Sequence, residues 1–364
     1  MWILIFCAAV ILFGGATAYV SSRIYKFTVT ELIARNRRWL KLVLSIAVPV
    51  VAILILCLTV GIINAAIIFI YLVLFWLIAD LIFYIIKKIR KKDFKIKYSA
   101  IAAIAVTAIY LSVAWVLAHD VKITRYSVDS DKQIGNVRIV QFADSHVGAT
   151  FGGDEFFEHV QQMQRQNPDV VVITGDYVDD DTSKADMQAA CAALGTLKTA
   201  YGVYFAFGNH DKGYFDNSGR GYDSQDLINE LTANNVIVLE DEHVLIDNRF
   251  YIVGRKDASE KDRKPIAELT AELDKSKYIV VLDHQPNDYD AEAESGADLV
   301  LSGHTHGGQL IPVNLFISIA NDKTYGMEKR GNTNFIVTSG ISDWAIKFKT
   351  GCRSEFNVID VNGV

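Results

Sequence analysis

The chain is poor in cysteine, and it lacks internal repeats and low-complexity linkers. Only four of its 364 residues are cysteines. Cys7 and Cys57 fall in apolar stretches, so Cys191 and Cys352 are the pair that could form a disulfide in an oxidising compartment. Two free thiols fit the sequence equally well. The absence of a repeat excludes a solenoid architecture.

Acidic residues are scarce in the first third of the chain. Residues 1–118 contain 13 Lys and Arg but only three acids, a formal charge of +10, whereas the remainder has 23 Lys and Arg, 39 Asp and Glu and a charge of −16. The acidic part lacks the basic footprint of nucleic-acid binding, so we expect no nucleic-acid partner. Its charge suits divalent cations, and it is long enough to bury its own core. We expect two domains, residues 1–120 and 121–364.

Four apolar stretches of membrane-spanning length occupy the first domain, over residues 1–20, 42–62, 65–86 and 98–118. A span needs about 20 apolar residues. Gly61 and Asn64 indicate a tight turn between the second and third stretches. Buried helices of a soluble protein are disfavoured because the pattern repeats four times. We therefore predict a transmembrane domain of four helices, in contact with membrane lipid.

Basic residues give the expected orientation of these spans. Six Lys and Arg lie between the first and second stretches and seven between the third and fourth, while the Gly61–Asn64 turn has none. By the positive-inside rule both basic loops are cytoplasmic, so the acidic domain is predicted to be extracytoplasmic. The first stretch lacks a positive n-region, which favours a retained anchor over a cleaved signal peptide. Asp80, inside the third span and not far from its cytoplasmic end, is interpreted as a snorkelling or packed carboxylate.

The second domain alternates short apolar runs with helical patterns, which indicates an α/β fold with helix-covered sheets. Five short polar strings each follow one of the predicted strands. They are Asp144-Ser145-His146, Gly175-Asp176-Tyr177-Val178-Asp179, Gly208-Asn209-His210-Asp211, Leu282-Asp283-His284 and Gly303-His304-Thr305-His306.

These strings contain five of the eight histidines. Ligand sites in open α/β sheets form beyond the carboxyl ends of the strands, so we expect the strings to meet at one rim. Their carboxylate, imidazole and amide groups could hold two metal ions. Such mixed ligands suit Mn, Zn or Fe better than Ca or Mg. Two such ions activate water for attack on a phosphate ester, so no Ser or Cys nucleophile is required.

In this order the strings resemble the motifs of the calcineurin-like metallophosphoesterases. The ending Gly303-His304-Thr305-His306-Gly307-Gly308-Gln309 is similar to a membrane-associated bacterial branch, whose members hydrolyse phosphodiesters or pyrophosphate-linked lipids. The resemblance covers roughly residues 135–360 and implies a β-sandwich flanked by helices. The family's Pro-rich C-terminal segments are missing here, which weakens inference about the substrate pocket.

The resemblance also implies a role for each metal-ligand candidate. One metal ion would be held by Asp144, His146, Asp176 and His306. The other would be held by Asp176, Asn209, His284 and His304, with Asp176 bridging the two. Chemical reasoning adds a catalytic set of His210, Asp179 and Asp211: His210 would protonate the leaving oxygen or stabilise charge on phosphorus, and Asp179 or Asp211 would orient it, as carboxylates commonly orient imidazoles.

The predicted function is a membrane-anchored, dinuclear metal-dependent phosphoesterase acting on a phosphodiester or pyrophosphate bond, in a lipid-linked or envelope substrate. The alternatives are a phosphomonoesterase or nucleotide phosphodiesterase with a soluble substrate, and a non-catalytic metal-binding membrane sensor. Two segments bear on the substrate. Leu310–Ala320 is either core or an apolar lip beside the site. Lys212–Asp223 is either a solvated loop or a substrate loop in which Arg220 holds a second phosphate.

Overall fold

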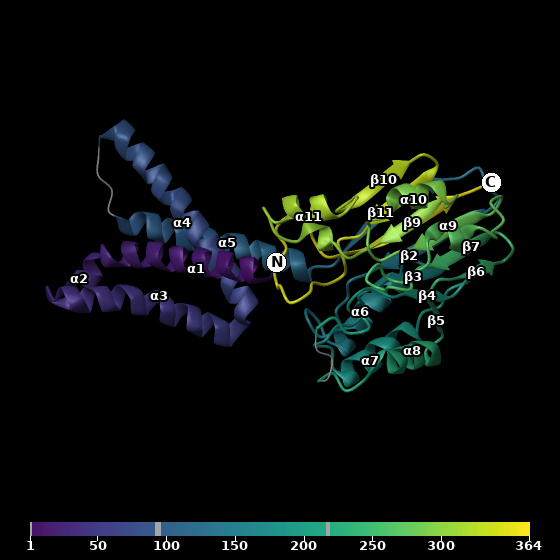
Figure 1. Ribbon diagram of the computed structural model, residues 1–364, viewed down its shortest axis with the longest axis horizontal. Coiled ribbons are helices and arrows are strands. Elements are labelled where there is room, and N and C mark those ends of the chain that lie inside the picture. Colours follow the sequence, from purple (N-terminus) through teal and green to yellow (C-terminus); the bar gives the residue numbers. More distant parts are fainter. Residues whose placement is uncertain (1, 92–95, 216–218) are drawn as a thin grey trace. The chain divides into compact units, whose positions relative to one another are not determined.

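The computed structural model describes residues 2–91, 96–215 and 219–364, with side chains from residue 10 onward except that of residue 96. The chain forms two compact units, Met1–Val113 and Ala114–Val364 (Figure 1). The first unit is helical, and the second contains all the strands that the described residues form.

The first unit consists of α1 (Trp2–Tyr25), α2 (Thr28–Ala34), α3 (Arg38–Val60), α4 (Ile62–Arg90) and most of α5 (Ile96–His119). Three segments, Arg38–Val60, Ile62–Arg90 and Lys97–His119, are long and apolar enough to cross a membrane. The span expected over residues 1–20 falls on α1, of which residues 2–9 have no described side chains. The four-span arrangement therefore stays a prediction.

Gly61 is the single residue between α3 and α4. Its φ of +82° lies in the region that glycine adopts without steric cost. The predicted turn is confirmed at Gly61, whereas Asn64 lies within the first turn of α4 and is buried.

Asp80 is paired within the first unit. Its Oδ2 atom lies 2.7 Å from Nη2 of Arg23 and accepts a 2.6 Å hydrogen bond from the Tyr19 hydroxyl. An unpaired carboxylate at membrane depth is costly, and these two contacts compensate its charge. Of the two interpretations that the sequence allows, Asp80 is thus a packed carboxylate.

The second unit contains two six-stranded mixed sheets. The first sheet has the order β1 (Lys122–Asp129), β12 (Glu355–Asn362), β2 (Asn136–Phe142), β3 (Val170–Thr174), β4 (Val203–Ala206) and β5 (Val236–Leu239). The second has the order β10 (Gly326–Arg330), β11 (Thr333–Val337), β9 (Leu299–Ser302), β8 (Tyr278–Leu282), β7 (Phe250–Gly254) and β6 (Glu242–Ile246). Strands β2 to β5 are parallel, as are β7, β8, β9 and β11.

The core has three layers. Successive residues of each strand point to opposite faces of the sheet, so each strand contributes side chains to two of these layers. Ile139 and Val172 of the first sheet and Leu301 of the second share one buried cluster between the sheets. On its other face the first sheet packs against α6 (Gly153–Gln164), α7 (Lys184–Leu194) and α8 (Ser224–Ala233). The second sheet packs against α9 (Ile266–Thr270) and α10 (Tyr289–Glu294), on the opposite side in Figure 1. The expected α/β sandwich flanked by helices is confirmed.

Candidate metal centre

The ligand candidates occupy the ends of strands from both sheets. In the first sheet, Asp144 and His146 follow β2, Asp176 follows β3, and Asn209 and His210 follow β4. In the second sheet, His284 follows β8, and His304 and His306 follow β9. The structure gathers six of these side chains into two groups, Asp144, His146 and His306, and Asp176, His284 and His304. Within each group the potential ligand atoms all lie within 4.8 Å of one another.

The backbone at these positions is unusual. The φ angles are 53° at Asp144, 36° at His146, 51° at Asp176, 71° at His304 and 48° at His306. A non-glycine residue in this left-handed region costs of order 1–3 kcal/mol, a cost that proteins commonly carry at functional sites. The chain reverses sharply after each strand and so turns the ligand side chains toward the rim.

Two motif glycines permit the close approach of these turns. A Cβ atom at Gly175 would lie 2.6 Å from Nδ1 of His284, and one at Gly303 would lie 2.7 Å from Oδ2 of Asp144. Any larger side chain at either position would displace a ligand candidate. The glycines of the motifs are therefore part of the geometry of the site.

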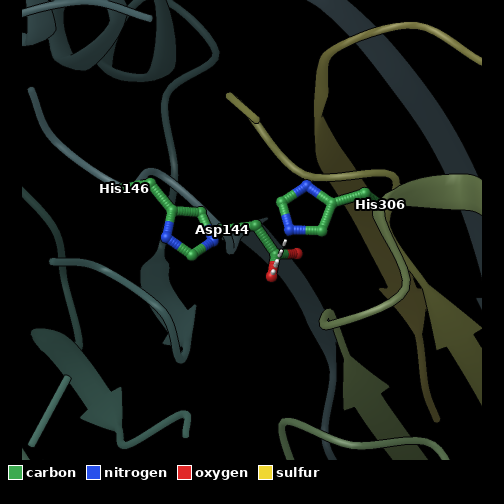
Figure 2. A group of neighbouring side chains, drawn as sticks. All are labelled: Asp144, His146 and His306. Atoms are coloured by element: carbon green, nitrogen blue, oxygen red, sulfur yellow. Dashed lines mark ion pairs between the residues drawn. The ribbon is translucent and has the colours of Figure 1, made fainter. Parts of the chain in front are cut away.

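In the first group, the Asp144 carboxylate lies between two imidazoles (Figure 2). The His306 Nε2 atom is 3.7 Å from Asp144 Oδ1, and the His146 and His306 rings stack with centroids 5.2 Å apart. Both carboxylate oxygens of Asp144 also accept from the backbone N–H of His304, at 3.0 Å each. Asp144 thereby connects the ends of β2 and β9.

One oxygen of Asp176 faces both groups. Its Oδ2 atom lies 3.1 Å from Nε2 of His284 and 3.7 Å from Nε2 of His146, while Oδ1 accepts a 2.8 Å hydrogen bond from the His210 backbone N–H. The Nδ1 atom of His284 is 2.8 Å from the Thr174 carbonyl oxygen. Nδ1 must therefore carry the proton, which leaves the Nε2 lone pair free to bind a metal ion.

Unpartnered buried atoms show that these residues fit a pair of cations. Nε2 of His146, Nε2 of His284 and Oδ1 of Asn209 are buried without a hydrogen-bond partner among the described residues. Buried polar atoms normally have such a partner. Burial lowers the pKa of His304 to about 4 and that of His306 to about 3, so both imidazoles are neutral at pH 7, as metal ligands must be.

His210 lies at the edge of this centre and belongs to neither group. Its ring packs edge-on against His146, with centroids 5.1 Å apart, and stacks on Tyr214 at 4.9 Å. Its Nδ1 atom has no hydrogen-bond partner in the described part of the chain. The imidazole is thus free to meet a substrate that binds at the rim.

Comparison with known proteins gives the family of this chain. The model of the calcineurin-like phosphoesterase family matches residues 137–308. An uncharacterized metallophosphoesterase of Aquifex aeolicus is 30% identical over 197 residues, which cover 52% of this chain and 71% of that protein. The chain belongs to the calcineurin-like metallophosphoesterases.

Other metallophosphoesterases give the same result. An uncharacterized one from Campylobacter jejuni is 29% identical over 234 residues, which cover 63% of this chain and 60% of the relative. A transmembrane protein with metallophosphoesterase domain from Danio rerio is 29% identical over 243 residues, which cover 63% and 54%. The chain thus spans less than two thirds of either relative. A solved dimetal phosphatase from Danio rerio has a TM-score of 0.37 and 13% identity, covering 56% of this chain and 87% of that one.

Two carboxylates of this metallophosphoesterase have partners that differ from the expected ones. Oδ2 of Asp179 lies 3.2 Å from Nδ1 of His146. Asp211 accepts four backbone N–H bonds at 2.7–3.0 Å, from residues 176, 177, 178 and 208. These bonds engage both carboxylate oxygens of Asp211, and its expected part in orienting His210 stays a prediction. Asp179 is placed to orient the ligand candidate His146.

A buried ion pair beside the metallophosphoesterase site escaped the sequence analysis. Oδ1 of Asp343 lies 3.6 Å from Nδ1 of His306 and 3.2 Å from Nζ of Lys349. Lys349 also donates to the carbonyl oxygens of Ser339, at 2.7 Å, and Ser342, at 3.2 Å. No motif signals these residues. An acid and a lysine close together in a largely apolar segment are the only hint in the sequence.

Arg220 supports the loop that follows His210. It is 3% exposed, its Nη1 donates to the Asp211 carbonyl oxygen at 3.1 Å, and its guanidinium lies over the Tyr222 ring. Its Nη2 atom is buried without a hydrogen-bond partner among the described residues, and the expectation that it holds a second phosphate stays a prediction. Within Lys212–Asp223, residues 216–218 lie outside the described residues.

The two cysteines of the second unit do not pair. Cys191 and Cys352 are free thiols. The Cys191 sulfur contacts Met187, and the Cys352 thiol donates to the His306 carbonyl oxygen at 3.0 Å. Of the two possibilities that the sequence leaves open, the structure has the free thiols.

Proposed function

We propose that this chain is a membrane-anchored phosphoesterase that uses two divalent metal ions. The observation that carries the proposal is the position of Asp176, whose Oδ2 faces the unpartnered Nε2 atoms of His146 and His284. A carboxylate oxygen between two groups of imidazoles and acids is suited to bridging two cations. Bound there, the two ions would polarise the phosphoryl group and lower the pKa of water, so that a nucleophile exists near neutral pH.

The ligands would be those expected from the motifs. Asp144, His146, Asp176 and His306 would hold one ion, and Asp176, Asn209, His284 and His304 the other. Thr174 fixes the tautomer of His284 through its carbonyl oxygen, and Asp179 orients His146. Both contacts direct imidazole lone pairs toward the centre before substrate arrives.

We assign His210 the role of contacting the substrate rather than a metal ion. It is 9% exposed and packs beside His146, its buried Nδ1 atom is unpartnered among the described residues, and its backbone is held by Asp176. It can donate a proton to the leaving oxygen or a hydrogen bond to a phosphoryl oxygen as negative charge develops there. The chain thus brings an acid to the side of the reacting phosphorus without using a protein nucleophile.

The proposed substrate is a phosphodiester or pyrophosphate in a lipid-linked or envelope compound. This choice is supported by the three helices long enough to cross a membrane and by relatives named as transmembrane proteins. We also propose that the phosphoesterase unit is extracytoplasmic, from the basic loops of the first unit. An impermeant maleimide should label Asn229→Cys on α8 in intact cells, and protection there would reverse the orientation.

The catalytic proposal is tested with the purified full chain, Mn²⁺ and bis-p-nitrophenyl phosphate. Asp176→Ala should abolish hydrolysis and lower the content of bound metal. His210→Ala should retain metal and slow hydrolysis by roughly 10²–10⁴-fold, the usual contribution of a positioned acid. The exposed Asp181→Ala is the matched control on the same acidic run and should behave as the parent chain. Full activity in both site variants would refute the mechanism.

A further inference from the structure

Helix α11 (Asn314–Ala320) presents an apolar face that no part of the described chain covers. Leu315 is 66% exposed, Phe316 68% and Ile319 80%, and α11 has no buried residue. Residues 309–321 carry no charge at all. Burying each such side chain contributes about 1.5–3 kcal/mol of favourable free energy. An exposed apolar face of three side chains is therefore a candidate binding surface.

The face is directional. Leu315 and Ile319 are four residues apart and Phe316 adjoins them, so the three side chains share one side of the helix. Asn314 belongs to the other side, where it lies against Gly308 of η1 (His306–Gly308). The helix is thus attached to the phosphoesterase unit by its polar side and turns its apolar side outward.

One loop of the second unit connects α11 to the end of a candidate membrane span. Lys349 N–H donates to the Ala114 carbonyl oxygen at 3.0 Å, and Ser354 donates to the carbonyls of Leu117, at 2.9 Å, and Ala118, at 2.6 Å. The same loop reaches the segment that leads into α11. Thr350 N–H donates to the Gln309 carbonyl oxygen at 2.8 Å.

The end of that span is also where a membrane surface is expected. The candidate span is Lys97–His119, and its last turn contains Trp115 stacked on His119, with centroids 4.1 Å apart. Aromatic residues of this kind are enriched at membrane–water interfaces. The loop that holds residues 114–118 must therefore lie close to the interface. Helix α11, seven residues and about 10 Å long, begins shortly after Ile311, whose N–H donates to the Thr350 hydroxyl at 2.7 Å.

We propose that the Leu315–Phe316–Ile319 face docks into the headgroup–acyl boundary of the lipid bilayer. Interfacial helices bury an apolar face about 5–10 Å into this region, a depth that matches these side chains. The bilayer is favoured over a protein partner because the hydrogen-bonded connection to α5 already places the start of α11 near it. A second copy of the chain or a soluble protein could cover the same face, but the hydrogen bonds to α5 give no reason for either to lie there.

The experiment measures the depth of a spin label on the full chain in phosphatidylcholine–phosphatidylglycerol liposomes. The label is attached at Ile319→Cys, with Asn229→Cys on α8 as the exposed control, after replacement of the four native cysteines. Power saturation is recorded with oxygen and with a water-soluble nickel chelate. The proposal expects the Ile319 label to be accessible to oxygen and shielded from nickel, and the Asn229 label to be accessible to nickel.

Two outcomes would overturn the proposal. Nickel accessibility at Ile319 equal to that at Asn229 would place the face in water, and low accessibility to both reagents would place it against protein. A second measurement covers loss of folding in the cysteine-replaced chain. A photoreactive benzoylphenylalanine at position 316 of the otherwise native chain should form adducts with lipid, and adducts only with protein would contradict bilayer docking.

Discussion

The Nζ atom of Lys349 lies 3.2 Å from Oδ1 of Asp343, and neither side chain has exposed surface. The same carboxylate oxygen is 3.6 Å from Nδ1 of His306. A buried lysine is tolerated because Asp343 and several carbonyl oxygens compensate its charge. The ion pair thus holds the Asp343 carboxylate beside His306, a ligand candidate that the sequence motifs identify.

Removal of the lysine should destabilise the protein. Lys349→Met would leave the Asp343 carboxylate buried without its cation, which typically costs 3–5 kcal/mol. Chemical denaturation of the purified chain measures this loss. Lys329→Met, at an exposed position of β10, should change the free energy of unfolding by less than about 0.5 kcal/mol. Equal stability of the two variants would contradict the buried ion pair.

Asp179→Asn should weaken metal binding without unfolding the chain. The substitution keeps the shape of the side chain but removes the charge 3.2 Å from Nδ1 of His146. Loss of a partner that orients a ligand typically costs 10–100-fold in metal affinity. Competition with a fluorescent chelator measures the change. Asp181→Asn, exposed on the same run, serves as the control, and unchanged affinity at Asp179 would show that its contact with His146 is not used.

Asp211→Ala should mainly lower the stability of the fold, and only secondarily the rate of hydrolysis. It would leave four buried backbone N–H groups without their acceptor, at about 1–3 kcal/mol for each group that finds no other partner. Thermal unfolding should show a large drop in Tm, and Asp211→Asn, which keeps one carbonyl oxygen, should show a smaller one. A stable Asp211→Ala chain with slowed hydrolysis would instead support a catalytic role for Asp211 beside His210.

Metal loading should stabilise the second unit. A ligand that binds only the folded state contributes about 2.7 kcal/mol for each site at 100 times its dissociation constant. Chelation should therefore lower the Tm of the parent chain, and added Mn²⁺ or Zn²⁺ should restore it. The Asp176→Ala chain should respond much less to either treatment. An equal response in the two chains would show that the ions bind elsewhere.

The sequence predicts the central strands best. Val170–Thr174 and Tyr278–Leu282 are among the short apolar runs that predict strands, because both faces of these strands are buried and the whole run is apolar. The edge strand β1 was missed, since Val128 is its one buried residue among eight and the rest reads as polar loop. Helix α11 could not be assigned, because an uncharged run fits a core segment and a surface lip equally well.

The candidate site shows the same contrast. Asp176 and His284 were foreseen because each follows a strand directly, and parallel strands bring such positions to one rim. Asp343 could not be foreseen, because its contact with His306 depends on how the C-terminal segment folds back. The surroundings of Arg220 could not be foreseen for a similar reason: a guanidinium in a glycine-rich loop suits phosphate, and only the folded loop shows that it is buried and donates to its own backbone.

Each group of ligand candidates takes side chains from both sheets: Asp144 and His146 face His306, and Asp176 faces His284 and His304. The separation of the two sheets therefore sets how far apart the halves of each group lie. That separation is determined by apolar residues between the sheets, such as Ile139 and Leu301, which have no polar atom near the rim. We therefore expect changes in the side-chain volume of this hydrophobic core to alter the spacing of the two halves of each group, and with it metal binding, while every ligand candidate is retained.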